Sequence, residues 1–329
     1  MTEPTPTSGI HHVTCIAGDP QQNMNFWTET LGLRLVKRSI NQDDPSTYHF
    51  FFADAEGTPG TSMTFFPWED LTQGKVGSGQ VSQIAFRVPA RSLDYWEDRF
   101  DQRGVDYDDR VERFDETVLP FRDPDGLPVE LIAVNVPEDD PTVPWTEFVP
   151  EEAAIRGFHS VTLWLADPDP TQDLLQTMGF RKVGTEQARG DTPGDKRTRF
   201  AATGSVGKYV DVLPTIESGR QGHGTVHHVA FQTPTDADQE AMRKAIRSAG
   251  LRPTAQIDRH WFRSVYFREF GGVLFELATS GPGYTSDEPL DDLGSRLVLP
   301  EKFEDRRDEI KAQLADVSIP LSKEINTGD

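Results

Sequence analysis

Two pairs of adjacent histidines could bind a metal ion. The strings GIHHVT and TVHHVA, near opposite ends of the chain, contain His11-His12 and His227-His228. A carboxylate, Glu276, follows the second string in the sequence Phe-Glu-Leu. Two histidines and one carboxylate on one face of a divalent ion form the facial triad of non-haem Fe(II) oxygenases, which leaves coordination positions open. This chemistry requires a fold that brings distant segments together.

An internal repeat supplies the elements that could do so. Four segments each read as a strand, a turn rich in Asp and Pro, an amphipathic helix and three further strands. Glycine is favoured directly after a helix, because it adopts left-handed geometry without strain. The segments begin at Gly9, Val81, Gly157 and Val226, and their helices end before Gly32, Gly104, Gly179 and Gly250. Each segment therefore predicts a βαβββ module. Module 1 is most similar to module 3, and module 2 is most similar to module 4.

The modules predict a division of the chain into halves. Residues 1–134 would contain modules 1 and 2, and residues 157–279 would contain modules 3 and 4. Residues 135–156 are rich in proline and aspartate, which predicts a linker. Residues 280–329 read as a polar tail with one helix near Glu301–Leu314.

The opening strands suggest which histidines bind the metal. One aligned column contains His11, Ser82, His159 and His227, and the next contains His12, Gln83, Ser160 and His228. Neighbours in a strand point to opposite faces, so one column lines a cavity. The first column shares its face with apolar residues and is expected to pack under the helices. His12 and His228 are therefore the predicted ligands. We predict a structural role for His159, and either a structural or a ligand-orienting role for His11 and His227.

The last strands suggest which modules meet. The corresponding column there contains Thr64, Glu130, Asp211 and Glu276. Pairing modules 1 and 2 would give one His and one Glu, and pairing modules 3 and 4 would give His, Asp and Glu beside Ser160. Modules 1 and 4 together give the full triad of His12, His228 and Glu276, with Thr64 as a weak fourth group. We predict that these modules enclose the metal and that modules 2 and 3 pair without one. The alternative is that the histidines are core residues.

Composition narrows the class of protein further. The single cysteine, Cys15, excludes a disulfide within the chain and a cysteine-based zinc site. The formal net charge of -21 disfavours nucleic acid and anionic membranes as partners. No apolar run approaches the roughly 20 residues that span a bilayer. The first residues are polar and lack the apolar core of a signal peptide, so a cytoplasmic protein is expected.

The four-module pattern, over about residues 9–279, resembles the vicinal oxygen chelate superfamily, which includes glyoxalases, extradiol dioxygenases and antibiotic-resistance proteins. The resemblance implies an α+β fold in which paired modules form two barrel-like mixed sheets around a metal cavity.

Three motifs narrow this resemblance to the para-hydroquinone ring-cleaving dioxygenases. They are HHVT in module 1, HHVAF in module 4 and the stretch DRHWFRSVYFREFGGVLFEL that contains Glu276. The resemblance implies a hydroquinone-type substrate, O₂ and Fe(II), although the same ligand set accepts Mn(II). It also implies roles near the substrate for five further residues. Tyr266, His227 and His11 would be catalytic groups that move protons, and Arg259 and Thr14 would help bind the substrate.

Three other functions are compatible with parts of this pattern. An extradiol catechol dioxygenase uses the same ligands but chelates both hydroxyls of its substrate. A glyoxalase-type isomerase or a thiol transferase uses a second carboxylate ligand, and the corresponding residue here is Thr64. A protein that binds aromatic compounds without catalysis would not need the triad. The sequence is also compatible with a homo-oligomer.

Overall fold

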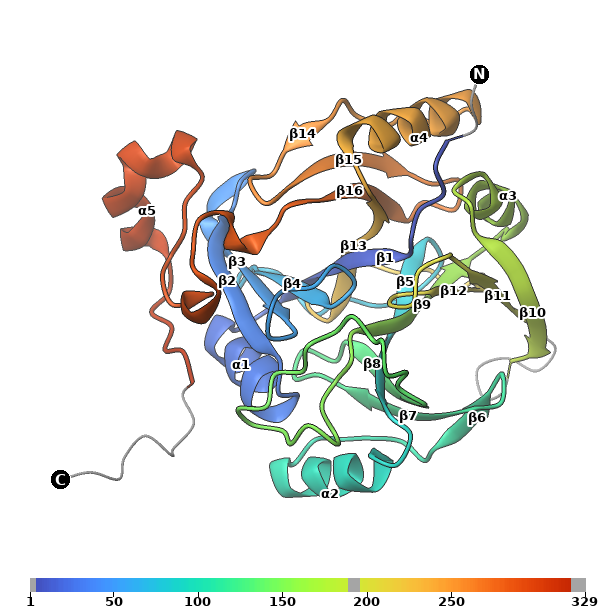
Figure 1. Cartoon of the computed structure of the whole chain (residues 1–329), viewed down its shortest axis with the longest axis horizontal. Coiled ribbons are helices and arrows are strands. Elements are labelled where there is room, and N and C mark those ends of the chain that lie inside the picture. The colour runs from blue at the N-terminus through green and yellow to red at the C-terminus, as the bar shows by residue number, and fades with distance from the viewer. Residues whose placement is uncertain (1–3, 189–195, 321–329) are drawn as a thin grey trace.

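The computed structural model describes residues 4–188 and 196–320, and it contains all four modules (Figure 1). Module 1 contains β1 (Ile10–Ala17), α1 (Pro20–Asn25), the π-helical turn η1 (Phe26–Thr30), β2 (Arg34–Asn41), β3 (Asp44–Ala53) and β4 (Ser62–Pro67). Module 2 contains β5 (Gln80–Pro89), α2 (Leu93–Arg103), β6 (Val111–Arg113), β7 (Glu116–Arg122) and β8 (Pro128–Val134). Module 3 contains β9 (Phe158–Leu165), α3 (Asp169–Thr177), β10 (Arg181–Gln187), β11 (Lys196–Ala201) and β12 (Tyr209–Pro214). Module 4 contains β13 (Thr225–Thr233), α4 (Asp236–Ser248), β14 (Ile257–Asp258), β15 (Phe262–Arg268) and β16 (Leu274–Pro282).

The modules combine into two curled sheets of eight strands each (Figure 1). Sheet A joins modules 4 and 1 in the order β14-β15-β16-β13-β1-β4-β3-β2, and sheet B joins modules 3 and 2 in the order β10-β11-β12-β9-β5-β8-β7-β6. The first and last strands of modules 1 and 4 run parallel, and β1 meets β13 antiparallel. The predicted pairing of modules and the α+β fold are confirmed. Each sheet contains strands from both halves of the chain, and the predicted boundaries at residues 134 and 156 stay predictions.

The helices follow the repeat, with one difference in module 1. The four glycines predicted to end the helices have φ between 66° and 100°. In module 1, α1 gives way to the wider turn η1, in which the Leu31 N–H donates to the Phe26 carbonyl at 3.0 Å. The wider turn buries the neighbouring rings of Phe26 and Trp27 together. Regular amphipathic periodicity does not predict this packing.

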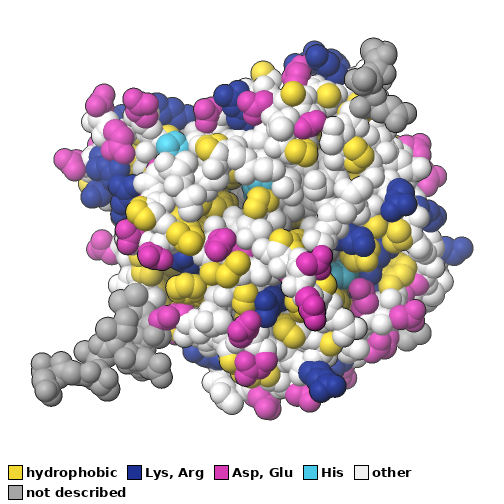
Figure 2. Space-filling view, viewed as in Figure 1, with side chains coloured by type: hydrophobic (Ala, Val, Ile, Leu, Met, Phe, Trp, Pro, Cys, Tyr) yellow, Lys and Arg dark blue, Asp and Glu magenta, His cyan; other side chains and the backbone are white. Residues whose placement is uncertain are grey.

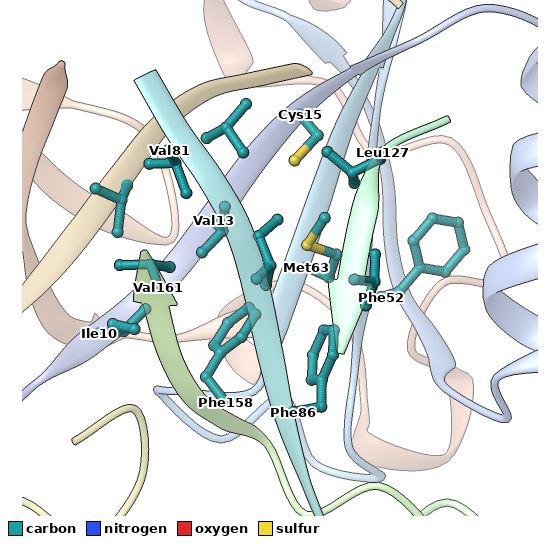
Figure 3. Close-up of a cluster of buried hydrophobic side chains, with 14 of the residues drawn as sticks. Ile10, Val13, Cys15, Phe52, Met63, Val81, Phe86, Leu127, Phe158 and Val161 are labelled. Atoms are coloured by element: carbon teal, nitrogen blue, oxygen red, sulfur yellow. The ribbon is translucent and has the colours of Figure 1, made fainter. Parts of the chain in front are cut away.

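The core lies where the two sheets and the helices meet. Figure 3 shows Val13, Cys15 and Met63 of sheet A facing Val81 and Phe86 of sheet B. The helices lie in two pairs on either side of this junction, α1 with α2 and α3 with α4 (Figure 1). The apolar face of each sheet is thus covered, and the concave, more polar face of sheet A surrounds a cavity.

One prediction about the opening strands is wrong. The pairing of β1 with β13 skips His11 and His227, and the pairing of β5 with β9 skips Ser82 and His159. Every member of the column predicted to pack under the helices is therefore the extra residue of a β-bulge. A bulge interrupts the alternation of side chains between the faces. His11 and His227 consequently lie beside the neighbouring histidines rather than behind the sheet.

The tail after β16 packs along the outer strands of module 1. It contains the short 3₁₀ turns η2 (Tyr284–Ser286), η3 (Leu290–Asp292) and η4 (Glu301–Arg306), and the helix α5 (Arg307–Gln313). The predicted helix is thus a 3₁₀ turn that continues into a short α-helix. The Val298 N–H donates to the Arg38 carbonyl at 2.9 Å, and the Tyr48 hydroxyl donates to the Ala315 carbonyl at 3.0 Å. These bonds attach the tail to β2 and β3, and Figure 1 shows the tail on the side of the molecule where these strands lie.

Acidic and basic side chains are interspersed on the face in Figure 2, without a continuous basic patch. Within the described residues, no helix is both long enough and apolar enough to cross a membrane.

Candidate metal centre

The three predicted ligands meet on the concave face of sheet A. His12 comes from β1, His228 from β13 and Glu276 from β16, and the three offer ligand atoms within 4.8 Å of one another. Glu276 Oε2 lies 3.3 Å from His12 Nε2 and 2.9 Å from His228 Nε2. The two Nε2 atoms are 3.4 Å apart. The structure thus brings together residues from both ends of the chain, and metal binding by them stays a prediction.

The geometry of this cluster fits a divalent cation. All three side chains are buried, with 4% exposure or less. Glu276 Oε1 accepts a hydrogen bond from Ser264 Oγ at 2.5 Å, whereas Oε2 is buried without a hydrogen-bond partner. The two imidazoles are close to Oε2 but do not satisfy it in hydrogen-bond geometry. An unsatisfied buried carboxylate oxygen is destabilising, and a cation among these three atoms would remove that penalty.

The bulge histidines His11 and His227 lie within hydrogen-bond distance of the two predicted ligand imidazoles. His11 Nδ1 lies 2.9 Å from His12 Nδ1, and His227 Nδ1 lies 2.8 Å from His228 Nδ1. If each ligand imidazole donates its Nδ1–H to the preceding histidine, its Nε2 lone pair points at the cluster. Burial lowers the pKa of His11 to about 3 and that of His227 to about 3, so both are neutral and can accept such a bond.

The charges of the cluster suit a metal site. Burial lowers the pKa of His228, so this imidazole is neutral at pH 7. Burial opposes ionisation of Glu276, but the two imidazoles outweigh it and hold its pKa well below the usual range. Neutral imidazole and ionised carboxylate are the forms that bind metals.

Tyr266 and Arg259 lie beside the cluster. Tyr266 pairs with Glu276 across neighbouring strands, and its ring meets the edge of His228 with centroids 5.7 Å apart. Arg259 Nε donates to the Tyr266 hydroxyl at 3.3 Å, and its NH2 group donates to Asp43 Oδ2 at 2.9 Å. Burial raises the pKa of Tyr266, so the phenol remains protonated and can donate a hydrogen bond.

A cavity of about 480 Å³ opens in front of the cluster. Its wall is largely aromatic, and polar residues of the β2–β3 turn lie on one side. The lining includes His12, Ile40, Asn41, Gln42, Asp43, Asp44, His49, Phe51, Phe66, Trp68, His227, His228, Arg259, Trp261, Phe262, Tyr266 and Leu274. An apolar wall with a few converging polar groups is typical of small-molecule sites.

The remaining predicted site residues differ in whether they line the cavity. His227, Arg259 and Tyr266 line the cavity, whereas His11 and Thr14 are not among the described lining residues. Thr14 is fully buried, and its hydroxyl lies 3.0 Å from His228 Nε2. The aromatic wall was not predicted, and neither was His49, because this histidine lies in a middle strand outside both aligned columns. The alternation of side chains along β3, compared with the neighbouring strands, could have indicated that His49 faces the cavity.

Comparisons with known proteins agree with this geometry. The sequence profile of the glyoxalase/bleomycin resistance protein/dioxygenase superfamily matches residues 9–131 and 132–277. The chain is 41% identical over 312 residues to "Putative ring-cleaving dioxygenase MhqO" of Bacillus subtilis, a match that covers 94% of this chain and 96% of the relative. It is 31% identical over 324 residues to the chlorohydroquinone/hydroquinone 1,2-dioxygenase of Sphingobium indicum, covering 96% of this chain and 98% of the relative.

Solved structures extend the likeness to three dimensions. A crystal structure described as a "putative dioxygenase from Bacillus subtilis" matches with a TM-score of 0.89 at 39% identity, covering 96% of this chain and 99% of the other. Glyoxalase I from Zea mays matches with a TM-score of 0.61 at 14% identity, covering 83% and 92%, which shows a shared fold. This chain belongs to the glyoxalase/bleomycin resistance protein/dioxygenase superfamily. Within it, the chain is similar over nearly its whole length to proteins named as ring-cleaving dioxygenases.

Proposed function

We propose that this protein is a metal-dependent dioxygenase that opens the ring of hydroquinone-type aromatic diols with O₂. The observation that carries the proposal is the buried triad of His12, His228 and Glu276 at the foot of an aromatic cavity. The similarity to the hydroquinone 1,2-dioxygenase of Sphingobium indicum supports the substrate class. In the reaction, a bond between a hydroxylated ring carbon and its neighbour breaks, and both atoms of O₂ enter the product.

The triad would hold Fe(II). Two imidazoles and one carboxylate would hold Fe(II) with positions left for a diol and O₂, and the metal would supply redox chemistry between them. The same ligand set accepts Mn(II), which is the second candidate.

Residues of the cavity would bind and orient the substrate. The wall includes Phe51, Phe66 and Phe262, which can pack on the faces and edges of an aromatic ring. Tyr266 can donate a hydrogen bond to an oxygen of the substrate, since Arg259 approaches the phenol oxygen as a donor. His227, which was predicted to move protons, presents a neutral, partly exposed imidazole to the cavity and can form a hydrogen bond with the substrate. The apolar wall excludes water from the remainder of the site.

The shape of the ligand set also separates this proposal from glyoxalase-type chemistry. Thr64 occupies the position that corresponds to Glu276 in module 1, as the pairings of Thr14 with Thr64 and of Ala230 with Glu276 show. A second carboxylate ligand is therefore replaced by a neutral hydroxyl. This favours a site with three protein ligands and several open positions.

The decisive experiment is O₂ consumption by the protein after anaerobic reconstitution with Fe(II) or Mn(II). We expect uptake with hydroquinone and methylhydroquinone, little with catechol, and none with the hemithioacetal of methylglyoxal and glutathione. Mass spectrometry after reaction in ¹⁸O₂ should find two labelled oxygen atoms in the ring-opened product. Uptake with catechol alone would assign the protein to the extradiol catechol dioxygenases instead. Isomerisation of the hemithioacetal would favour a glyoxalase.

The predicted cytoplasmic location and the exclusion of nucleic acid and membranes as partners stay predictions.

A further inference from the structure

A chain of hydrogen bonds leads from the ligand cluster to His49 in the cavity wall. Thr14 Oγ1 lies 3.0 Å from His228 Nε2 and 2.7 Å from Thr64 Oγ1. Thr64 Oγ1 in turn lies 3.0 Å from His49 Nε2. Both threonines are fully buried, and His49 lines the cavity between Phe51 and Phe66. The two buried hydroxyls therefore connect two imidazoles that both line the cavity, His228 and His49.

The repeat makes His49 of module 1 equivalent to Ser264 of module 4. Each of these residues contacts the cluster-facing residue on the last strand of its module. Phe51 pairs with Thr64 as Tyr266 pairs with Glu276, so His49 corresponds to Ser264, two residues before Tyr266. Ser264 fixes the Glu276 carboxylate by donating to Oε1 at 2.5 Å. His49 contacts Thr64 in the same way at 3.0 Å. Glu276 and the equivalent Thr64 are thus each oriented by a side chain on the neighbouring strand.

The direction of the hydrogen bonds follows from the number of protons available. With a metal bound at His228 Nε2, that nitrogen has neither a proton nor a free lone pair for Thr14. Each threonine hydroxyl has one proton to donate. If His49 Nε2–H donates to Thr64, then Thr64 donates to Thr14, and the Thr14 proton is free to point into the ligand cluster beside His228. If His49 does not donate, the chain can reverse and Thr14 becomes an acceptor.

We propose that His49 is a positioning residue that fixes this chain in one direction, so that Thr14 presents its hydroxyl as a donor to an oxygen atom that binds beside His228 Nε2. This inference rests on the proposed function and adds to it a residue that touches no metal ligand. A preorganised donor beside the ligand cluster would stabilise negative charge that develops on oxygen during the reaction. Because the effect passes through two hydroxyls, it should alter turnover rather than substrate binding.

The test compares His49→Leu, His49→Gln and Thr64→Val in the full-length protein reconstituted with Fe(II). Leucine removes the donor, glutamine restores an N–H at a similar reach, and valine removes the next hydroxyl while keeping the shape. We expect kcat for hydroquinone to fall roughly 10- to 100-fold in His49→Leu and Thr64→Val, below the ~10²–10³-fold loss of a donor in direct contact with the charge. KM should change less than about threefold, and His49→Gln should recover most of the rate.

Two further measurements separate this role from a merely structural one. The double variant His49→Leu/Thr64→Val should be no slower than either single variant, because both break the same chain. In addition, the electron paramagnetic resonance signal of the anaerobic Fe(II) protein with nitric oxide should shift alike in both single variants and return in His49→Gln. The affinity for Fe(II), measured by calorimetry, should stay within about threefold of the wild type.

The outcomes distinguish failure of the inference from failure of the proposed function. If wild-type protein is active and His49→Leu retains its kcat and its nitric oxide signal, the role of His49 is overturned and the dioxygenase proposal stands. Additive losses in the double variant would also overturn it. If the wild type consumes no O₂ with any diol, the dioxygenase proposal fails, and the nitric oxide signal alone decides whether His49 orients the chain.

Discussion

The two sheets are built on the same frame but neutralise their buried carboxylates differently. In sheet A, Glu276 faces two imidazoles, and its Oε2 is without a hydrogen-bond partner. In sheet B, the corresponding carboxylates are Glu130 and Asp211, and both are buried. Arginine side chains bind these two carboxylates. The comparison teaches that a buried acidic corner needs a cation, which the chain itself can supply or leave to a metal.

The arginine contacts in sheet B are bidentate. Arg113 binds Glu130 through two nitrogens at 2.6 and 2.8 Å. Arg199 binds Asp211 through two nitrogens at 2.8 and 3.0 Å. Burial opposes ionisation of Asp211, but Arg199 outweighs it and holds the pKa of this carboxyl below its usual range. Fork-shaped guanidinium groups match carboxylates well, so no acidic oxygen at these two residues is left for a metal.

Tyr266 marks the point at which the sheets diverge. By strand pairing, Arg259 in sheet A corresponds to Arg113 in sheet B. Pro120 of sheet B corresponds to Tyr266, and Arg113 passes it to reach Glu130. In sheet A the Tyr266 hydroxyl accepts a bond from Arg259, and Asp43 accepts another. Tyr266 and Asp43 thus keep the guanidinium away from Glu276.

The largest expected effect comes from removing a histidine predicted to bind the metal. His228→Ala should weaken Fe(II) binding and lower kcat/KM at least ~10³-fold, more than the 10–100-fold typical of residues that only support a ligand. The control is Ser160→Ala, the corresponding position of sheet B, which should change neither quantity by more than about threefold. Calorimetric titration with Fe(II) and O₂ uptake check both. Wild-type metal affinity in His228→Ala would refute the ligand assignment.

The next effect tests the arginines of sheet B. Arg199→Met leaves Asp211 buried without its main partner, which should lower the free energy of unfolding by roughly 3–5 kcal/mol. Urea denaturation measures this loss. Activity per folded molecule should not change, because Arg199 does not line the cavity in front of His12. The double variant Arg199→Met/Asp211→Leu should recover much of the stability. Loss of less than about 1 kcal/mol would show that Arg197, whose NH1 lies 3.4 Å from Asp211 Oδ2, neutralises Asp211 in place of Arg199.

The repeat allowed much of this arrangement to be predicted from sequence. Comparison of equivalent positions in the four modules predicted His12, His228 and Glu276 as the metal ligands, because modules 1 and 4 together supply the full triad. The structure brings these three residues together. The same alignment located Glu130 and Asp211 as the corresponding residues of sheet B. It gave no partner for them, because a guanidinium reaches its carboxylate from another strand.

Other features could not be read from the sequence because they depend on local departures from regularity. Strict alternation placed His11 and His227 on the helix side, whereas one bulge in each strand turns them toward His12 and His228. His49 belongs to a middle strand. Its connection to the ligand cluster depends on its contact with Thr64 and on the hydrogen bond between Thr64 and Thr14. Contacts that join three strands require the register of the sheet, which single-strand patterns do not specify.

A smaller effect should follow when the barrier between Arg259 and Glu276 is removed. In Tyr266→Ala, Arg259 can reach Glu276 as Arg113 reaches Glu130, and Fe(II) affinity should fall about 10- to 100-fold. The double variant Tyr266→Ala/Arg259→Met should recover the affinity, although not the activity. Tyr266→Phe keeps the ring and should bind Fe(II) like the wild type. Calorimetry of the three variants checks this, and equal affinities throughout would show that Tyr266 does not separate the two groups.

The smallest expected effect is the absence of a new metal site when histidines are placed in sheet B. Gln83→His/Ser160→His, made in the His228→Ala background, reproduces the histidine positions of sheet A. We expect no Fe(II) binding above that background, because Arg113 and Arg199 already occupy both oxygens of Glu130 and of Asp211. Calorimetry measures binding, and circular dichroism verifies that the variant folds. Stoichiometric binding would mean that the histidines alone create the site and that the arginines follow from the lack of a metal. Failure to bind would mean that the free carboxylate oxygen of Glu276 distinguishes the sheets as much as the histidines do.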